Sequence, residues 1–157
     1  MLTSEILNPE LSFHHLECAS KKRLLENLSN SISEVVPSFD ADELFDNLIA
    51  REKLGSTGLG EGVAIPHCRL ENCFDASGTI VKLSSSIDFD AIDGEPVDLL
   101  FILIVPKEAT QDHLDILSKV AELFNNPDVR NQLRNTKNSE ELYETTLSYM
   151  QDLDSTP

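Results

Sequence analysis

Residues 51–67 read Arg-Glu-Lys-Leu-Gly-Ser-Thr-Gly-Leu-Gly-Glu-Gly-Val-Ala-Ile-Pro-His, and the rest of the chain is best understood from this stretch. Four of the six glycines of the protein lie between Gly55 and Gly62. Glycine is used where the backbone must turn with positive φ or approach another group closely. We expect a helix that ends near Gly55, a glycine-rich loop, a short strand at Val63–Ile65, and then His67. A histidine delivered in this way is accessible to a group from outside.

Two helices are expected before this stretch. Ser20 is suited to cap the first helix, whose apolar residues recur at helical spacing until Pro37. Asp40 is suited to cap the second helix, which we expect to end at Gly55. Arg51 would then lie in the last turns, where a cation is favourable to the helix dipole. From the residues alone, that role and a role in holding a phosphoryl group are both open for Arg51.

The segment before about Glu17 is expected to be an irregular lead-in. His14 and His15 are adjacent, so in a helix or a strand their side chains should point in different directions, which argues against a metal pair. Cys68 and Cys73 have a spacing allowed for zinc ligands, but no second clear pair accompanies them. No metal and no other cofactor is therefore expected.

Downstream, alternating and apolar segments predict strands. These are Thr79–Leu83, a partly exposed strand at Ile87–Ala91, and Leu99–Val105, which is apolar at every position. A continuous apolar run is typical of a strand that is covered on both faces, so we place Leu99–Val105 at the centre of the sheet. Helices are expected to begin after Thr110, at Asn126-Pro127 and at Ser139-Glu140-Glu141.

The order of helices and strands predicts the fold class α/β, with a mixed β-sheet and helices packed on both faces in a single layered domain. This domain is expected to span residues 1–150. Residues 151–157 are expected to form a frayed acidic C-terminal tail.

Composition limits the classes of partner. The 157 residues include 28 acidic and 12 basic side chains, for a formal charge of −16, which argues against binding to nucleic acid or to anionic membranes. The longest apolar run, Leu99–Val105, is too short to insert across a bilayer, and the N-terminus does not have the pattern of a signal peptide. Three cysteines without secretory context indicate reduced thiols. A cytoplasmic protein is expected.

Two other uses of this part of the sequence are disfavoured. The segment Gly58–Gly62 follows a helix and precedes a strand, which is the reverse of the order in dinucleotide-binding sites. A nucleophilic pair of His67 and Cys68 is also disfavoured, because neighbouring side chains of a strand point to opposite faces.

Five segments carry a family resemblance: Arg51–Gly58, Gly62–His67, Phe89–Asp93, Pro96–Phe101 and His113–Leu114. Together they resemble the IIA components of the bacterial phosphotransferase system (PTS). The chain is similar to the mannitol/fructose class, and most similar to its nitrogen-regulatory branch. The resemblance implies the mannitol-type IIA fold and a PTS IIA type-2 domain over residues 1–150.

The resemblance also implies roles for individual residues. His67 would be the phosphorylated histidine, with His113 and Arg51 in support of it. Ser56 and Thr57 lie in the matching loop and would contribute hydroxyl donors to phosphoryl binding. Neutral imidazole suits this task because its nitrogen attacks without first losing a proton. From spacing alone, His113 is more simply a polar residue at the start of a surface helix.

The partners implied are a histidine-containing phosphocarrier protein as phosphoryl donor and a set of regulatory target proteins. One alternative is that the phosphoryl group passes to a IIB domain for fructose/mannitol-type sugar uptake; another is a non-catalytic interaction module. The oligomeric state is left open. One departure from the resembling proteins is that Cys68 follows His67, where glycine is common.

Overall fold

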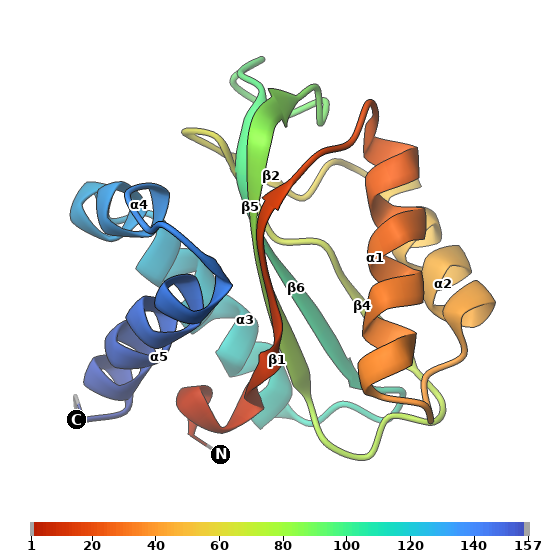
Figure 1. Ribbon diagram of the computed structural model, residues 1–157. Coiled ribbons are helices and arrows are strands. Elements are labelled where there is room, and N and C mark those ends of the chain that lie inside the picture. Colours follow the sequence, from red (N-terminus) through yellow and green to blue (C-terminus); the bar gives the residue numbers. More distant parts are fainter. Residues whose placement is uncertain (1, 156–157) are drawn as a thin grey trace.

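Strand β6 (Val97–Pro106) runs through the middle of a six-stranded mixed sheet in the computed structural model, which describes residues 2–155 (Figure 1). Strand order is β1-β5-β6-β3-β2, and β4 also pairs with β6. Pairing is antiparallel between β6 and β5 and parallel between β6 and both β3 and β4. The other strands are β1 (Leu7–Leu16), β2 (Gly58–Gly60), β3 (Val63–Ala64), β4 (His67–Leu70) and β5 (Ser77–Ile87).

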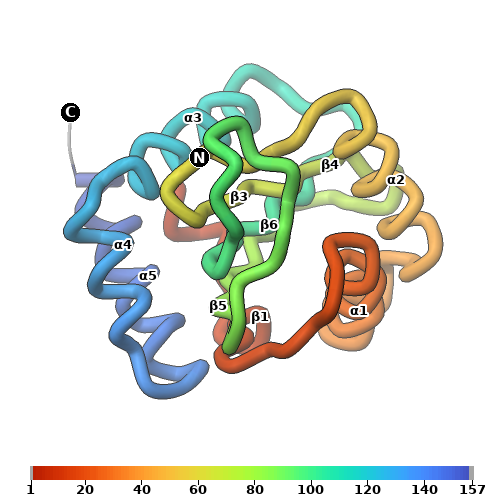
Figure 2. The backbone as a smooth tube through the Cα atoms, turned by 90° about the horizontal axis from the view of Figure 1, so that it is seen from above, coloured from red at the N-terminus to blue at the C-terminus, as the bar shows by residue number. Residues whose placement is uncertain are grey.

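Helices cover both faces of the sheet, as the sequence predicts (Figure 2). One face carries α1 (Lys21–Val35) and α2 (Ala41–Lys53). The other face carries α3 (Gln111–Phe124), α4 (Pro127–Arg134) and α5 (Ser139–Ser155). None of the helices within residues 2–155 is both long enough and apolar enough to cross a membrane.

The side chains of β6 explain why this strand is apolar at every position. Leu100, Ile102 and Ile104 are buried in the core beneath α1 and α2, whereas Leu99, Phe101, Leu103 and Val105 are buried in the core beneath α3, α4 and α5. Successive residues of a strand face opposite sides of its sheet, so both sets must be apolar when both faces are covered. The predicted central strand is confirmed.

The predicted helix starts are also confirmed. The Ser20 hydroxyl accepts a hydrogen bond from the backbone N–H of Arg23 at 3.2 Å, and the Asp40 carboxylate accepts one from Glu43 at 2.9 Å. Thr110 is the N-cap residue of α3. The Ser20 and Asp40 side chains thereby occupy donors that the first helical turn leaves unpaired.

The irregular lead-in predicted before Glu17 is wrong. A short 3₁₀ helix (Thr3–Ile6) precedes β1, which pairs in parallel with β5 at the edge of the sheet. Irregularities interrupt the register of this pair, and Pro9 is tolerated because an edge strand has one unpaired side. The strand consequently shows no clean alternation of apolar and polar residues.

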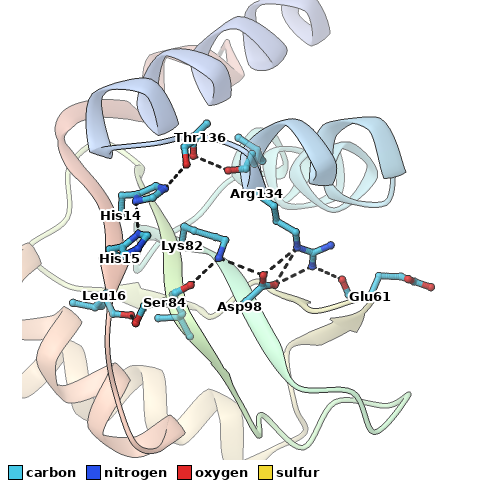
Figure 3. Close-up of polar contacts among 11 residues, drawn as sticks. His14, His15, Leu16, Glu61, Lys82, Ser84, Asp98, Arg134 and Thr136 are labelled. Atoms are coloured by element: carbon cyan, nitrogen blue, oxygen red, sulfur yellow. Dashed lines mark hydrogen bonds and ion pairs between the residues drawn. The ribbon is translucent and has the colours of Figure 1, made fainter.

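The expectation that His14 and His15 point apart is also wrong. His15 has a φ of 65°, and the two rings stack with centroids 4.8 Å apart (Figure 3). Nε2 of His14 lies 2.7 Å from the carbonyl oxygen of Thr136. The left-handed residue breaks the alternation on which the prediction rested.

The separate strand predicted at Ile87–Ala91 does not form. Ile87 ends β5, and the chain then leaves the sheet, because Asp90 has a φ of 53° and its N–H bonds to the Asp88 carboxylate at 3.0 Å. Phe89 and Ala91 belong to this loop, and their side chains are buried although they are not part of a strand.

Arg134, the last residue of α4, connects the helical layer to the sheet (Figure 3). Its guanidinium contacts the Asp98 carboxylate at 2.9 Å and donates to the carbonyl oxygen of Glu61 at 2.6 Å. Lys82 lies 3.5 Å from the same Asp98 carboxylate. Gly62 has a φ of 79°, and a Cβ atom there would lie 2.5 Å from the Arg134 guanidinium, so this position of the β2–β3 turn requires glycine.

The frayed tail predicted for residues 151–157 is wrong for residues 151–155, which continue α5; residues 156–157 lie outside the described part. The carboxylate of Asp154 accepts hydrogen bonds from the backbone N–H of Thr3 at 2.6 Å and of Ser4 at 2.9 Å. The Ser4 hydroxyl donates to it as well, at 2.6 Å. The last helix therefore holds the first turn of the protein in place.

We predict that Asp154→Asn lowers the free energy of unfolding by about 1–2 kcal/mol, because an amide accepts these bonds more weakly than a carboxylate does. Urea titration followed by circular dichroism measures the change. Glu144→Gln removes the same charge at an exposed position of α5 and is the matched control. Equal effects of the two substitutions would show that the contact with the first turn is unimportant.

Candidate functional site

His67 begins β4, where the chain rejoins the central strand of the sheet. Its ring is partly buried, and Nδ1 lies 2.8 Å from the carbonyl oxygen of Ile65. A carbonyl oxygen only accepts hydrogen bonds, so Nδ1 is the protonated nitrogen in this contact. The lone pair of the neutral ring is therefore on Nε2.

Arg51 approaches this lone pair from the last turn of α2. Its Nε donates to Nε2 of His67 at 3.3 Å, and its Nη1 donates to the carbonyl oxygen of Gly55 at 2.9 Å. The first contact agrees with the tautomer set by Ile65, because Nε2 must be the acceptor. The guanidinium thus hydrogen-bonds to the lone pair of Nε2, and this contact must open before that nitrogen can react.

His113 lies in the first turn of α3 and has the opposite tautomer. Its Nδ1 accepts a hydrogen bond from the backbone N–H of Thr110 at 3.0 Å. The proton of the neutral ring is consequently on Nε2, which is left as a donor. His113 therefore combines the capping role that spacing suggests with a free N–H on its other side.

One cavity of about 510 Å³ brings these three side chains together. Its wall includes the end of α2, the start of β4 and the start of α3, and its lining residues are Asn47, Ala50, Arg51, Leu54, His67, Cys68, Arg69, Leu103, Val105, His113, Leu114 and Leu117. Leu54 is 84% exposed and Leu114 is 43% exposed, so the rim of the cavity is apolar. A cationic and imidazole-lined floor within an apolar rim suits an anionic group presented by another protein.

Burial of the His67 ring lowers its pKa below the usual 6.5, and the positive charge of Arg51 lowers the pKa further. The hydrogen bond to Ile65 and the charge of Glu52 act in the opposite direction but do not reverse the shift. His67 is therefore neutral, with an available lone pair, at neutral pH.

Ser56 and Thr57 lie beside this group and line a smaller cavity of about 190 Å³, together with Arg51 and His67. The Ser56 hydroxyl donates to the carbonyl oxygen of Phe89 at 2.7 Å, and the Thr57 hydroxyl donates to the carboxylate of Glu52. Each hydroxyl has one proton, which here goes to a protein acceptor. Their predicted role as phosphoryl donors finds no support in this geometry.

Glu52 is a residue of the site that the sequence did not single out. It is only 8% exposed and contacts Thr57 and, at 2.7 Å, Nζ of Lys21. One signal was available, because a carboxylate in the last turn of a helix is unfavourable to the helix dipole. Lys21, a cation in the first turn of α1, is also unfavourable to the dipole of its helix. The ion pair between Lys21 and Glu52 offsets both unfavourable placements.

Cys68 follows His67 without disturbing the site. Its backbone is not left-handed, so the position does not require the glycine common in the resembling proteins. All three cysteines are free, as predicted, and burial raises the pKa of Cys68 to about 12. Within residues 2–155, no three His, Cys, Asp or Glu side chains are placed together to hold a metal ion.

Residues 5–148 match the family model described as "Phosphoenolpyruvate-dependent sugar phosphotransferase system, EIIA 2". A nitrogen regulatory protein of Pseudomonas aeruginosa is 48% identical over 140 residues, which are 89% of this chain and 91% of the relative.

Two solved structures extend this comparison. The nitrogen regulatory protein IIA-Ntr from Neisseria meningitidis superposes with a TM-score of 0.84 at 40% identity, over 94% of this chain and 97% of that one. IIA mannitol from Escherichia coli superposes with a TM-score of 0.71 at 17% identity, over 88% and 96% of the two chains. The second likeness shows the fold alone, and it confirms the predicted mannitol-type architecture.

We predict that the ring of His67 titrates by NMR with a midpoint below 6.5 and that Arg51→Ala raises this midpoint, because the substitution removes a nearby positive charge. Arg51→Lys should raise it less. Arg69→Ala removes a cation from the same cavity that does not contact His67 and should leave the midpoint unchanged.

The lowered pKa of His67 also determines how the stability of the fold depends on pH. Because the pKa of His67 is lower in the folded chain than in the unfolded chain, its contribution to stability is complete above pH 6.5. It is lost as the pH falls through the folded-state pKa. A midpoint at or above 6.5 in the folded protein would contradict the site described here.

Proposed function

The chain belongs to the EIIA 2 family of the phosphoenolpyruvate-dependent sugar phosphotransferase system, and from this membership we propose that His67 accepts a phosphoryl group on Nε2. One observation carries the proposal. The lone pair of Nε2 lies next to the Arg51 guanidinium in a cavity that also contains His113. The donor is a phosphocarrier protein that bears the group on a histidine of its own.

The transfer step exchanges one N–P bond for another. As the Arg51 N–H moves from Nε2 of His67 to the phosphoryl oxygens, the lone pair of Nε2 attacks the phosphorus atom, and the bond between phosphorus and the donor's imidazole nitrogen breaks. The electron pair of that bond returns to the donor's ring. The proton on Nδ1 of His67 stays in its hydrogen bond to Ile65. No proton has to leave the attacking nitrogen, which is why a neutral imidazole serves here.

Arg51 and His113 stabilise the charge of the transferred group. The planar guanidinium of Arg51 offers parallel N–H donors that match two phosphoryl oxygens at once. His113 offers its Nε2–H, and it lies in the first turn of α3, where the helix dipole favours an anion. Phosphoryl transfer leaves the protein little covalent work beyond this positioning and charge stabilisation.

We infer that the phosphorylation state of His67 controls binding to target proteins. Support comes from relatives named nitrogen regulatory proteins, one of which matches 89% of the chain at 48% identity. Phosphorylation adds roughly two negative charges at the floor of a cavity with an apolar rim. Such a change alters a docking surface without requiring the fold to move. Transfer onward to a IIB protein is the second possible destination of the group.

We predict that incubation with the phosphorylated carrier labels the protein at one acid-labile site and that His67→Ala abolishes the label. His14→Ala, which removes a histidine from the far edge of the sheet, should be labelled at the wild-type rate. Label that persists in His67→Ala would overturn the assignment. Binding of the labelled and unlabelled forms to a purified IIB protein then separates regulation from onward transfer.

We predict that Arg51→Ala slows phosphoryl transfer by roughly 100-fold, as expected for the loss of one charge-stabilising donor group. Arg51→Lys should fall between this variant and the wild type, because a point charge replaces a two-pronged donor. Single-turnover kinetics with the phosphorylated carrier measure both rates. Equal rates for the wild type and Arg51→Ala would exclude the proposed role of the guanidinium.

A further inference from the structure

The carboxylate of Glu52, the residue after Arg51, is the anchor of the loop behind the site. It accepts a hydrogen bond from the backbone N–H of Thr57 at 3.2 Å and a second one from the Thr57 hydroxyl. Thr57 is only 6% exposed, so both bonds are shielded from water. Two bonds to one residue fix that residue in position and in orientation.

From Thr57 the connection continues to the reacting histidine. The carbonyl oxygen of Thr57 accepts a hydrogen bond from the N–H of Ile65 at 3.1 Å. The carbonyl oxygen of Ile65 then accepts the Nδ1–H of His67 at 2.8 Å. Nε2 of the same ring accepts the N–H of Arg51 at 3.3 Å, and Arg51 is covalently joined to Glu52. These contacts form a closed ring through the end of α2, the loop, Ile65 in the connection between β3 and β4, and the start of β4.

The charge of Glu52 is balanced from a different helix. Nζ of Lys21 lies 2.7 Å from the Glu52 carboxylate, and the two side chains are 18% and 4% exposed. The Lys21 ammonium also lies 4.4 Å from the centre of the Phe89 ring. A buried carboxylate is costly unless it is paired and hydrogen-bonded, and here it is both. The Glu52 carboxylate is therefore itself held in place by Lys21 of α1.

We propose that Glu52 and Thr57 are positioning residues for phosphoryl transfer, because the closed ring of contacts sets the Arg51 guanidinium against Nε2 of His67. Neither residue touches the phosphoryl group in this assignment. The Thr57 hydroxyl acts inward, on Glu52, rather than outward on the ligand. The proposal rests on the proposed function of His67.

The physical reason is that transfer depends steeply on geometry. A displacement of about 1 Å between reacting groups costs roughly 100-fold in rate. Arg51 lies in the last turn of α2, where helices fray most readily, and its side chain is long and flexible. Contacts that hold this turn against the β3–β4 segment are accordingly contacts that set the rate.

The test compares three substitutions of buried threonines. Thr57→Val removes the hydroxyl and keeps the shape, whereas Thr57→Ser keeps the hydroxyl and removes a methyl group. Thr146→Val removes an equally buried hydroxyl, which bonds to the carbonyl oxygen of Leu142 at 2.8 Å within α5. The readouts are the single-turnover rate with the phosphorylated carrier, the NMR titration midpoint of His67 and the thermal unfolding temperature.

We expect Thr57→Val to slow transfer by tenfold or more and to raise the His67 midpoint, because Arg51 moves away from the ring. Thr57→Ser should restore most of the wild-type rate. Thr146→Val should lower the unfolding temperature and leave the rate and the midpoint unchanged. A wild-type rate and midpoint in Thr57→Val, or a Thr57→Ser variant as slow as Thr57→Val, would overturn the proposal.

Should Thr57→Val unfold at the assay temperature, Glu52→Gln replaces it, with the rate as readout. Because both substitutions weaken the same contact, the double variant, assayed at a temperature where Thr57→Val is folded, should be little slower than the slower single variant. Additive losses would contradict a shared role. The two proposals fail separately: absence of label on wild-type His67 removes the transfer function, whereas the His67 midpoint tests the positioning role without any phosphoryl donor.

Discussion

The hydrogen bond from Nδ1 of His67 to the carbonyl oxygen of Ile65 is the interaction on which the rest of the site depends. It fixes the tautomer, so the lone pair must lie on the opposite nitrogen. It also fixes the plane of the ring, because the acceptor belongs to the backbone just before the histidine. Arg51 meets the ring on the side that this bond leaves open. Without it, the imidazole could present either nitrogen, and no single geometry for transfer would exist.

The sheet supplies the rigidity that such a bond requires. β3 and β4 both run parallel to β6, and the short connection between them is fastened where the N–H of Leu103 bonds to the carbonyl oxygen of Pro66 at 3.0 Å. β6 is packed on both faces, and β4, which begins at His67, is hydrogen-bonded directly to it. Arg51 and His113, by contrast, come from helix termini: Arg51 from the last turn of α2 and His113 from the first turn of α3.

Sequence reasoning succeeded where one local signal was sufficient. The caps at Ser20 and Asp40 and the apolar central strand each follow from a few adjacent residues. It failed where the outcome depends on partners distant in the chain: β1 is a strand because β5 lies beside it, and the side chain of Thr57 turns inward because Glu52 is buried beneath it. The grouping of His67, Arg51 and His113 was predicted from a family resemblance, because their spacing in the sequence does not indicate that His113 lies near His67.

The two buried thiols near the site have a chemical consequence. Burial raises the pKa of Cys68 to about 12 and that of Cys73 to about 11, so almost no thiolate exists at either position at neutral pH. Peroxides and alkylating reagents react with the thiolate form of cysteine, so both cysteines should resist them. Maleimide dyes should therefore couple at Cys18, the partly exposed cysteine beside the start of α1. A fluorescent reporter can thus be attached without blocking the imidazole next to Cys68.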